Sequence, residues 1–395
     1  MTSWANSCRS AMIEPGATIG ILGGGQLGRM AGMAARSLGY DVHVLDPDPN
    51  CPASAIASRT IAARFDDADA AGSLAERCAV VTLEIEQIGT AALAAVAART
   101  ALRPGAGAVH IIQDRIRQNE WLDAQGFPVG PFRAVSSRDE SVAAFETLGR
   151  CIFKSTSGGY DGRGQVRVST ADGAAAAWTS LGARPCLVEQ FLDIDVEISM
   201  LVARRPAPVG SARDPEMVLF PPSFNSHTQG ILDWAVLPAR VPDATVARAD
   251  EIARGIAGSL GVEGLLAVEM FVLADGRLLV NELAPRPHNT FHSTERGCAT
   301  SQFEQLVRAV CDLPLGSTEV LRPAAIANLL GDLWSDGDPD FAAALLVPTV
   351  RLHLYGKAAA RPGRKMGHVS AVGQTGDEAV ARVLGARDAM STRTR

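Results

Sequence analysis

Short apolar runs alternate with alanine-rich segments over the first third of the chain. Strand-like runs occupy 19–22, 41–45 and 79–84, and apolar residues at helical spacing occupy 26–37 and 91–100. Alternating strands and helices are typical of βαβ units, whose strands pair in parallel. The pattern therefore predicts an N-terminal α/β domain over residues 17–112, and we expect residues 1–16 to be a disordered extension.

The pattern changes after residue 112. A helix that carries Asp114, Arg115 and Trp121 ends near Gly126, and strand-like runs follow at 151–154, 165–168, 187–191, 197–203, 266–273 and 277–283. This order predicts an α+β domain over residues 113–311. The remaining residues, 312–395, contain a strand-like run at 349–354 and the basic loop YGKAAARPGRKMGH, and we expect a smaller C-terminal domain there.

Composition excludes several classes of partner. The 395 residues are 47% hydrophobic and carry a net charge of −6, with 5% aromatic residues and no long basic run, which argues against nucleic-acid or anionic-membrane binding. No run reaches the ~18 apolar residues of a membrane span, and the N-terminus lacks a signal-peptide core. The seven cysteines form no C-x-x-C pair, which favours reduced thiols in the cytoplasm and argues against a zinc site.

A glycine-rich turn follows the first predicted strand. Gly23, Gly25 and Gly28 form G-x-G-x-x-G, and Asp46 ends the next strand 23 residues after Gly23. Backbone N–H groups at such a turn and at the helix that follows favour a phosphate, and the acid suits a ribose. Taken alone, the turn is compatible with NAD or FAD, with another phosphate ligand, or with a tight structural turn.

A second glycine-rich loop, KSTSGGYDGRGQ, spans 154–165. Its four glycines follow a strand that ends in Lys154, so unhindered amides and a fixed positive charge could close over a polyphosphate. The alternative is a solvated hairpin tip. The loop is not a Walker motif, because the G-K-[ST] ending is missing.

The hairpin around Asp275 and Gly276 predicts a pair of carboxylates. If these two residues form a two-residue turn, positions summing to 551 pair and Glu269 lies opposite Glu282. Like charges in such a position are destabilising unless a cation such as Mg²⁺ lies between them, with nucleotide phosphates completing the coordination of the ion. A one-residue slip or a solvent-facing pair is the alternative, and Asn281 points to the other face unless a bulge intervenes.

Other polar residues gather in three segments. Glu189 and Glu197 could bind ribose hydroxyls or be ordinary solvent-facing strand residues. Two later segments, APRPHNTFHS and the basic loop, offer anion and polar ligands rather than a metal cluster: Arg286, His288, Asn289, Lys357, Arg361, Arg364, Lys365 and His368. His292 is expected to be structural.

Seven strings in chain order together resemble one family. They are GGGQLGRM, TLEIEQI, QDR, KSTSGGYDGRGQ, NSHTQGI, NELAPRPHN and YGKAAARPGRKMGH. The set resembles the ATP-grasp superfamily and, within it, the 5-(carboxyamino)imidazole ribonucleotide synthases over about residues 17–370. The resemblance implies an ATP-grasp fold with a Rossmann-like pre-ATP-grasp domain and a small C-terminal domain, whose N-terminal turn serves the small substrate rather than a nicotinamide.

The resemblance also implies a ligase of purine biosynthesis. Such an enzyme uses ATP and Mg²⁺ to carboxylate aminoimidazole ribonucleotide with bicarbonate through carboxyphosphate, and it is expected to be a homodimer. By resemblance the ATP-binding residues are Arg115, Lys154, the lid residues Gly158, Gly159, Tyr160, Asp161, Gly162, Arg163 and Gly164, then Glu189, Gln190, Phe191, Leu192, Glu197, His227, Asn281 and Glu282.

The remaining roles follow from the same resemblance. Glu269 and Glu282 hold magnesium, and the ribonucleotide is bound by Gly25, Gln26, Leu27, Arg286, His288, Asn289, Lys357, Arg361, Arg364 and Lys365, with its phosphate on Lys357 and Arg364. The catalytic group comprises Tyr160, Asp161, Arg163 and one of Glu84 and Glu86. Asp161 is the candidate that takes or orients the proton of the substrate amine.

Two positions depart from related enzymes. Gln118-Asn119 stands where many relatives place a lysine, and Ala284 stands where many other ATP-grasp enzymes keep an asparagine. The second departure argues against biotin-carboxylase-type and peptide-type ligases. The alternatives are a formate-dependent glycinamide ribonucleotide transformylase, against which the RPGRKMGH string argues, and a nucleotide-binding regulator without turnover.

Overall fold

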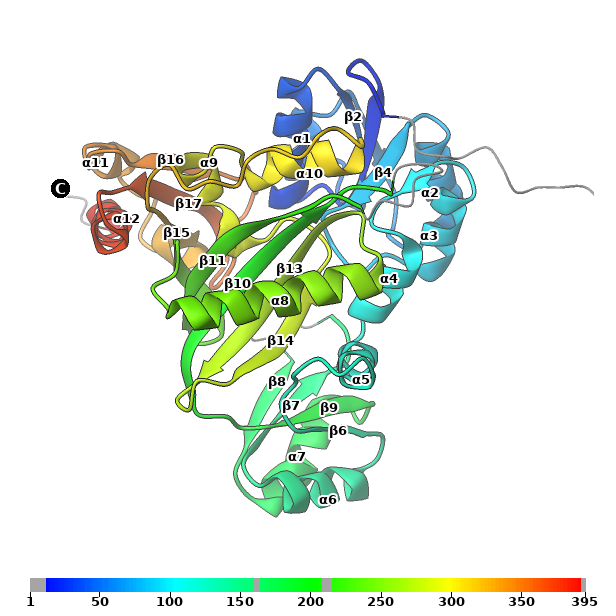
Figure 1. Ribbon diagram of the computed structural model, residues 1–395, viewed down its shortest axis with the longest axis vertical. Coiled ribbons are helices and arrows are strands. Elements are labelled where there is room, and N and C mark those ends of the chain that lie inside the picture. The colour runs from blue at the N-terminus through cyan, green and yellow to red at the C-terminus, as the bar shows by residue number, and fades with distance from the viewer. Residues whose placement is uncertain (1–11, 159–163, 208–214, 392–395) are drawn as a thin grey trace, which may run out of the picture.

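Five parallel strands form the N-terminal sheet, in the order β3-β2-β1-β4-β5 (Figure 1). The computed structural model describes residues 12–158, 164–207 and 215–391. The N-terminal elements are β1 (Thr18–Leu22), α1 (Gln26–Ser37), β2 (Asp41–Asp46), β3 (Arg59–Ala62), α2 (Ala68–Ala75), β4 (Val80–Leu83), α3 (Thr90–Ala97), β5 (Ala101–Leu102) and α4 (Ala106–Ile112). The parallel sheet predicted from the alternating pattern is therefore confirmed.

The structure describes part of the segment that was expected to be a disordered N-terminal extension. Residues 1–11 lie outside the described residues, but residues 12–16 are fixed against the domain. The Ile13 N–H donates to the Cys311 carbonyl at 2.9 Å, and the Tyr40 hydroxyl donates to the Ile13 carbonyl at 2.6 Å. The expectation of disorder is wrong for this stretch, because the apolar Ile13 side chain packs on the core between the N-terminal domain and α10 (Gln302–Val310).

A small antiparallel sheet follows, in the order β6-β9-β7-β8, in the lower part of Figure 1. Its elements, with the helix that precedes them, are α5 (Arg115–Ala124), β6 (Phe132–Val135), α6 (Arg138–Leu148), β7 (Cys151–Ser155), β8 (Gln165–Val168), α7 (Ala171–Ser180) and β9 (Cys186–Gln190). Apolar residues of α6 and α7 pack on one face of this sheet. The opposite face is left for polar side chains such as Lys154.

The third sheet, called the large sheet below, has eight antiparallel strands in the order β14-β13-β10-β11-β12-β15-β17-β16. Its strands are β10 (Ile194–Arg204), β11 (Met217–Thr228), β12 (Ile231–Leu237), β13 (Gly264–Leu273), β14 (Leu278–Ala284), β15 (Ala324–Leu330), β16 (Arg351–Leu354) and β17 (Lys365–Val372). The strands after residue 312 thus extend the sheet of the central domain. The accompanying helices are α8 (Asp243–Leu260), α9 (Thr294–Gly297), α10, α11 (Phe341–Leu345) and α12 (Gly376–Ser391).

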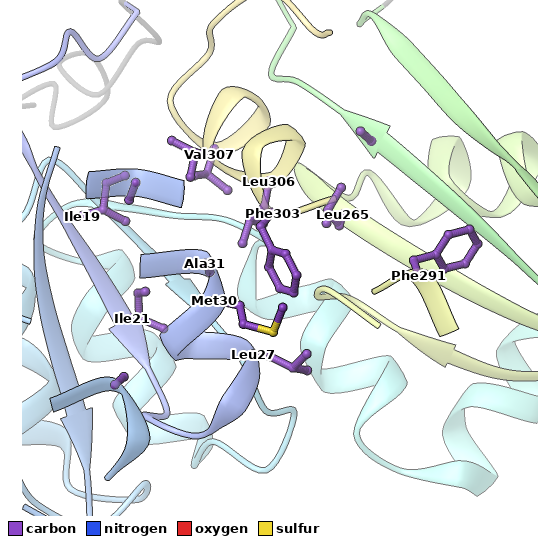
Figure 2. Close-up of a cluster of buried hydrophobic side chains, with 14 of the residues drawn as sticks. Ile19, Ile21, Leu27, Met30, Ala31, Leu265, Phe291, Phe303, Leu306 and Val307 are labelled. Carbon is purple, nitrogen blue, oxygen red and sulfur yellow. The ribbon is translucent and has the colours of Figure 1, made fainter. Parts of the chain in front are cut away.

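An apolar core joins the N-terminal domain to the large sheet. Figure 2 shows Leu27 and Met30 of α1 beside Phe303 and Leu306 of α10, with Leu265 of β13 close by. These five side chains are at most 6% exposed. Because α1 begins at the glycine-rich turn, this core fixes the turn relative to the large sheet.

The helices were also compared with the length and apolar character of a membrane-spanning helix. Within 12–158, 164–207 and 215–391, no helix combines the length and the apolar character needed to cross a bilayer.

Candidate active site

A cavity of about 970 Å³ lies between the two sheets and the N-terminal turn. The site residues predicted from the sequence line it wherever the structure describes them, except Gly164 and His368, which are not among the lining residues. The lining residues among them are Gly25, Gln26, Leu27, Glu84, Glu86, Arg115, Lys154, Gly158, Glu189, Gln190, Phe191, Leu192, Glu197, His227, Glu269, Asn281, Glu282, Arg286, His288, Asn289, Lys357, Arg361, Arg364 and Lys365. Side chains from all parts of the chain thus meet in one space.

Part of the second glycine-rich loop cannot be placed. Gly159, Tyr160, Asp161, Gly162 and Arg163 lie outside the described residues, so three of the predicted catalytic residues stay a prediction. Gly164 is described, and its carbonyl accepts a hydrogen bond from the Ser155 N–H at 2.9 Å, which closes the base of the loop.

The prediction that His368 is a polar ligand of the site is wrong. His368 is 1% exposed, lies opposite His353 in the β16–β17 pair, and hydrogen-bonds through Nδ1 to the Tyr355 hydroxyl at 2.9 Å. It also stacks on His292, which is fully buried, as expected for a structural histidine. Burial lowers the pKa of both imidazoles well below 6.5, with the neighbouring histidines adding to the shift. Both faces of β17 are buried, and His368 is enclosed by the rings of His292, His353 and Tyr355 rather than facing the cavity.

The predicted pair Glu269 and Glu282 is confirmed, although the predicted turn is wrong. Glu269 lies opposite Glu282 in the β13–β14 ladder. The Leu273 N–H, however, donates to the Arg277 carbonyl at 2.9 Å, so the loop has three residues and ends at Gly276, whose φ is +83°. A bulge further along restores the register.

Asn281 is the extra residue of that bulge. Met270 pairs with Val280, Glu269 pairs with Glu282, and Asn281 between them has no partner across the ladder. The bulge turns its side chain toward the cavity, where Asn281 Nδ2 lies 3.3 Å from Glu269 Oε2. The longer turn and the bulge shift the strand register in opposite directions, so Glu269 and Glu282 still pair. The bulge adds Asn281 to the same face.

The Glu269 carboxyl is an electrostatically costly group. Burial and the nearby negative charge of Glu282 raise its pKa to about 7. The His288 Nε2 atom lies 3.2 Å from Glu269 Oε1, and burial holds the pKa of His288 well below 6.5, so this imidazole is neutral near pH 7 and does not neutralise the pair. Oxygen ligands that repel one another in this way suit a hard divalent cation such as Mg²⁺.

Lys154 of β7 belongs to a polar network on the opposite wall. Its Nζ forms an ion pair with Glu189 of β9 and lies 3.4 Å from Asn281 Oδ1. The Asn119 Nδ2 donates to the other Glu189 oxygen at 3.0 Å. Asn119 therefore has a role in this network as a neutral donor, which was not predicted from the sequence.

Two further ion pairs reach the same space. Arg115 NH2 lies 3.6 Å from Glu282 Oε1, and His227 Nδ1 lies 2.7 Å from Glu197 Oε2. Burial lowers the pKa of His227, but the hydrogen bond and charge of Glu197 outweigh it and raise the pKa above 6.5. The polar residues predicted around the nucleotide are thus paired with one another across strands that are distant in sequence.

The apolar wall of the cavity was missed by sequence reasoning. Ile152 of β7, Phe271 of β13 and Val280 of β14 line the cavity beside the charged residues. A signal for two of them exists, because Ile152 and Phe271 stand two positions from Lys154 and Glu269, and alternate residues of a strand share a face. Such a wall provides an apolar surface beside the charged groups, as a nucleobase requires.

The N-terminal glycine-rich turn is filled by side chains of the protein itself. The Gly25 and Gly28 N–H groups donate to the two carboxylate oxygens of Glu84 at 2.5 and 2.6 Å. The Gly24 N–H donates to Asp46 Oδ2 at 2.8 Å. A Cβ atom on Gly25 would lie 2.4 Å from Glu84 Oε1, so the glycine accommodates a carboxylate. The amides that would bind a dinucleotide phosphate already have anionic partners.

Residues of the N-terminal, central and C-terminal parts of the chain meet at Gln26, on one side of the cavity. Gln26 Nε2 donates to Asn289 Oδ1 at 3.1 Å, and Lys357 Nζ donates to Gln26 Oε1 at 2.5 Å. Arg286 NH2 lies 2.6 Å from Glu86 Oε1, and the buried Arg286 Nε has no hydrogen-bond partner among the described residues. Glu86 thus pairs with a cavity arginine, whereas Glu84 is occupied with the turn.

A cluster of Glu295, His353 and His368 lies outside this cavity. Their ligand atoms lie within 4.8 Å of one another. The rings of His353 and His368, however, stack at 5.1 Å between centroids with only 7° between their planes. Imidazole lone pairs lie in the ring plane, so these two rings cannot point at one ion without rotating.

The small four-stranded sheet, the large eight-stranded sheet and the cavity between them define an ATP-grasp protein. A family model described as the ATP-grasp domain matches residues 120–303, the ribonucleotide synthetase preATP-grasp domain matches residues 16–113, and the phosphoribosylaminoimidazole carboxylase C-terminal domain matches residues 324–382. The chain belongs to the N5-carboxyaminoimidazole ribonucleotide synthase family.

Relatives and solved structures match along nearly the whole chain. N5-carboxyaminoimidazole ribonucleotide synthase of Brucella melitensis is 40% identical over 364 residues, 91% of this chain and 97% of the relative. The Bacillus subtilis enzyme of the same name is 38% identical over 375 residues, 94% and 96% of the two chains. A Staphylococcus aureus N5-carboxyaminoimidazole synthetase structure with ADP has a TM-score of 0.88 at 34% identity, covering 97% of this chain and 100% of the other.

One solved structure contains the small substrate. The Aspergillus clavatus N5-carboxyaminoimidazole synthase, solved with ADP and 5-aminoimidazole ribonucleotide, has a TM-score of 0.85 at 33% identity, covering 95% of this chain and 99% of the other. The family model over residues 324–382 also favours this family over the transformylase considered from the sequence.

Proposed function

We propose that the chain catalyses the ATP-dependent carboxylation of 5-aminoimidazole ribonucleotide with bicarbonate, giving N5-carboxyaminoimidazole ribonucleotide, ADP and phosphate in purine biosynthesis. The observation that carries the proposal is the single cavity that Lys154 and Glu269 share with Gln26 and Lys357. A nucleotide on the first pair and a ribonucleotide on the second would lie in one water-restricted space. The family relationship and the relatives' complexes with ADP and the ribonucleotide support the same reaction.

The cavity residues fit Mg²⁺. Glu269 and Glu282 would hold it, because they supply facing carboxylates and a buried acidic group that lacks a full cationic partner. When bound with ATP, the ion neutralises phosphate charge. Asn281, between the two carboxylates and Lys154, holds the Glu269 side chain in place.

The first chemical step is phosphoryl transfer. A bicarbonate oxygen attacks the γ-phosphorus of ATP in line, the bond to the bridging oxygen breaks, and ADP and carboxyphosphate form. Lys154 is placed to carry negative charge on the phosphates, for which it would exchange its present contact with Glu189. Arg115, beside Glu282, offers a second positive charge on the same wall.

The second step forms the carbon–nitrogen bond. The exocyclic amine of the substrate attacks the carbon of carboxyphosphate or of the CO₂ that it releases, phosphate leaves, and the amine loses a proton. Arg286 is suited to hold the anionic reactant, because its buried Nε has no partner among the described residues. Carboxyphosphate is unstable in water, so the loop 158–164 is assigned the role of a lid, with Asp161 taking or orienting the amine proton.

The remaining assignments concern the substrate and the assembly. Lys357 and Arg364 are proposed to bind the ribonucleotide phosphate, with Arg361 and Lys365 beside them and Gln26 against the base. Gly25, Leu27, His288 and Asn289 complete this side of the cavity. The homodimer and the cytoplasmic location implied by the sequence resemblance belong to the same proposal.

A coupled assay of ADP release tests the function. We expect ADP release from the wild-type enzyme to require both 5-aminoimidazole ribonucleotide and bicarbonate. ADP release that depends instead on formate and glycinamide ribonucleotide would identify the transformylase. No release with either substrate pair, in protein that still binds ATP, would identify a regulator and refute the proposal.

A further inference from the structure

Glu84 occupies a position that the proposed chemistry does not use. It follows β4 directly, and its carboxylate bridges Gly25, which precedes α1, and Gly28 in the first turn of α1. N–H groups at a helix N-terminus carry a partial positive charge and commonly bind a ligand anion. Here the protein supplies the anion.

The turn is shaped to accept this carboxylate. A Cβ atom on Gly25 would lie 2.4 Å from Glu84 Oε1, and one on Gly23 would lie 2.5 Å from Glu84 Cγ. Burial raises the pKa of Glu84, whereas the two N–H donors and the charge of Arg286 lower it and compensate in part. A partly buried carboxyl group whose two oxygens each have a dedicated N–H donor indicates a specific structural task.

Gln26 connects this carboxylate to the substrate side. It is the first residue of α1 and lies between Gly25 and Gly28, so its backbone is flanked by the two N–H groups that Glu84 binds. Its amide bridges Lys357 Nζ at 2.5 Å and Asn289 Oδ1 at 3.1 Å. Lys357 also donates to the Lys365 carbonyl at 2.7 Å, within the basic loop.

We propose that Glu84 is a positioning residue for 5-aminoimidazole ribonucleotide, because it fixes the turn that sets Gln26 between Lys357 and Asn289. This inference rests on the proposed function. It assigns different tasks to the two acids of TLEIEQI: Glu86 pairs with the cavity residue Arg286, and Glu84 acts through the backbone of the turn.

The test is a double-mutant cycle with Glu84→Gln and Gln26→Ala. The amide in Glu84→Gln has one acceptor for two N–H donors. We therefore expect the KM for 5-aminoimidazole ribonucleotide to rise about tenfold or more, with the ADP affinity unchanged. If Glu84 acts through Gln26, adding Glu84→Gln to the Gln26→Ala enzyme should raise that KM less than about twofold.

The matched control is an acid-to-amide change elsewhere in the N-terminal domain. Asp46 is avoided because it binds the Gly24 N–H of the same turn; the control is instead Asp67→Asn, whose carboxylate accepts from the Ala70 N–H at the start of α2, away from the turn and the cavity, so this variant should keep the wild-type KM. Additive effects in the cycle, or a wild-type KM in Glu84→Gln, would overturn the inference. If Glu84→Gln does not fold, the cycle is run with Glu84→Asp, whose shorter side chain cannot reach both donors, and the same criteria apply.

The two proposals fail in different ways. If the wild-type enzyme shows no ADP release with 5-aminoimidazole ribonucleotide and bicarbonate, the proposed function fails. If the wild type turns over and the cycle is additive, only the role of Glu84 fails.

Discussion

Replacing Glu269 by glutamine should change how the stability of the unliganded protein depends on pH. Burial and the charge of Glu282 raise the pKa of Glu269 from 4.5 to about 7. A group with a raised pKa binds its proton more tightly in the folded state. Its favourable contribution to the free energy of unfolding is therefore fully present below pH 4.5 and is lost as the pH rises toward 7. At about 1.4 kcal/mol per pKa unit, the loss is ~3 kcal/mol above pH 7.

Glutamine does not titrate, so Glu269→Gln should lack this loss. We expect wild type and variant to differ by a roughly constant amount below pH 4.5. Between pH 5 and pH 8.5 the free energy of unfolding of the variant should rise relative to wild type by up to ~3 kcal/mol. Comparing one variant across pH cancels the fixed cost of losing an acceptor for His288, 3.2 Å away.

Urea denaturation of ligand-free protein at pH 5 and pH 8.5 measures this effect. Glu251→Gln is the matched control, because Glu251 is exposed on α8 and paired only with Arg248 at one helical turn. It should keep the wild-type pH dependence. The same Glu269→Gln protein should also lose ADP release in the presence of Mg²⁺. An unchanged pH slope in Glu269→Gln would refute the view that the facing carboxylates are an electrostatic strain relieved by a cation.

Two further predictions follow from the site and the core. Lys154→Met should raise the KM for ATP about tenfold or more by removing a charge-assisted contact, while the KM for 5-aminoimidazole ribonucleotide stays within about twofold. ADP-release kinetics measure both constants, and Arg133→Met, on the exposed side of β6, is the control. An unchanged KM for ATP would remove Lys154 from the nucleotide site. Phe303→Ala should lower the free energy of unfolding, measured by urea denaturation, by about 3–5 kcal/mol, because Phe303 is 1% exposed between α1 and the large sheet. Met33→Ala, at a position 44% exposed on α1, should change it by less than about 0.5 kcal/mol. Similar values for both variants would contradict the assignment of a shared core.

The architecture explains why the domains are expected to work as one unit. The apolar core of Figure 2 ties α1 to α10, and strands from before and after residue 312 share one sheet. The cavity is lined from all of these parts. A change in the packing between them would therefore shift Gln26 relative to Lys357 and to the nucleotide residues.

Sequence patterns failed where tertiary context overrode local preference. The strand β11 contains Pro221 and Pro222, which lack the N–H groups of a sheet ladder and argue against a central strand. The structure places them at a register shift against β10, between the pairs of Phe220 and Ser223. The short strand β3 was likewise missed, because RTIA is too brief and too polar for the apolar pattern to reveal.

By itself the sequence determined the strand–helix alternation that gives the parallel N-terminal sheet, the hairpin that brings Glu269 and Glu282 together, and the strings that identify the family, because each is written in local patterns of residues. The tertiary structure decided that Asn281 turns into the cavity, that His368 is buried, that Asn119 supports Glu189, and that Glu84 rather than a ligand fills the glycine-rich turn. The bulge at Asn281 cannot be seen in the local pattern of the hairpin, and the other three outcomes depend on contacts between residues far apart in the chain.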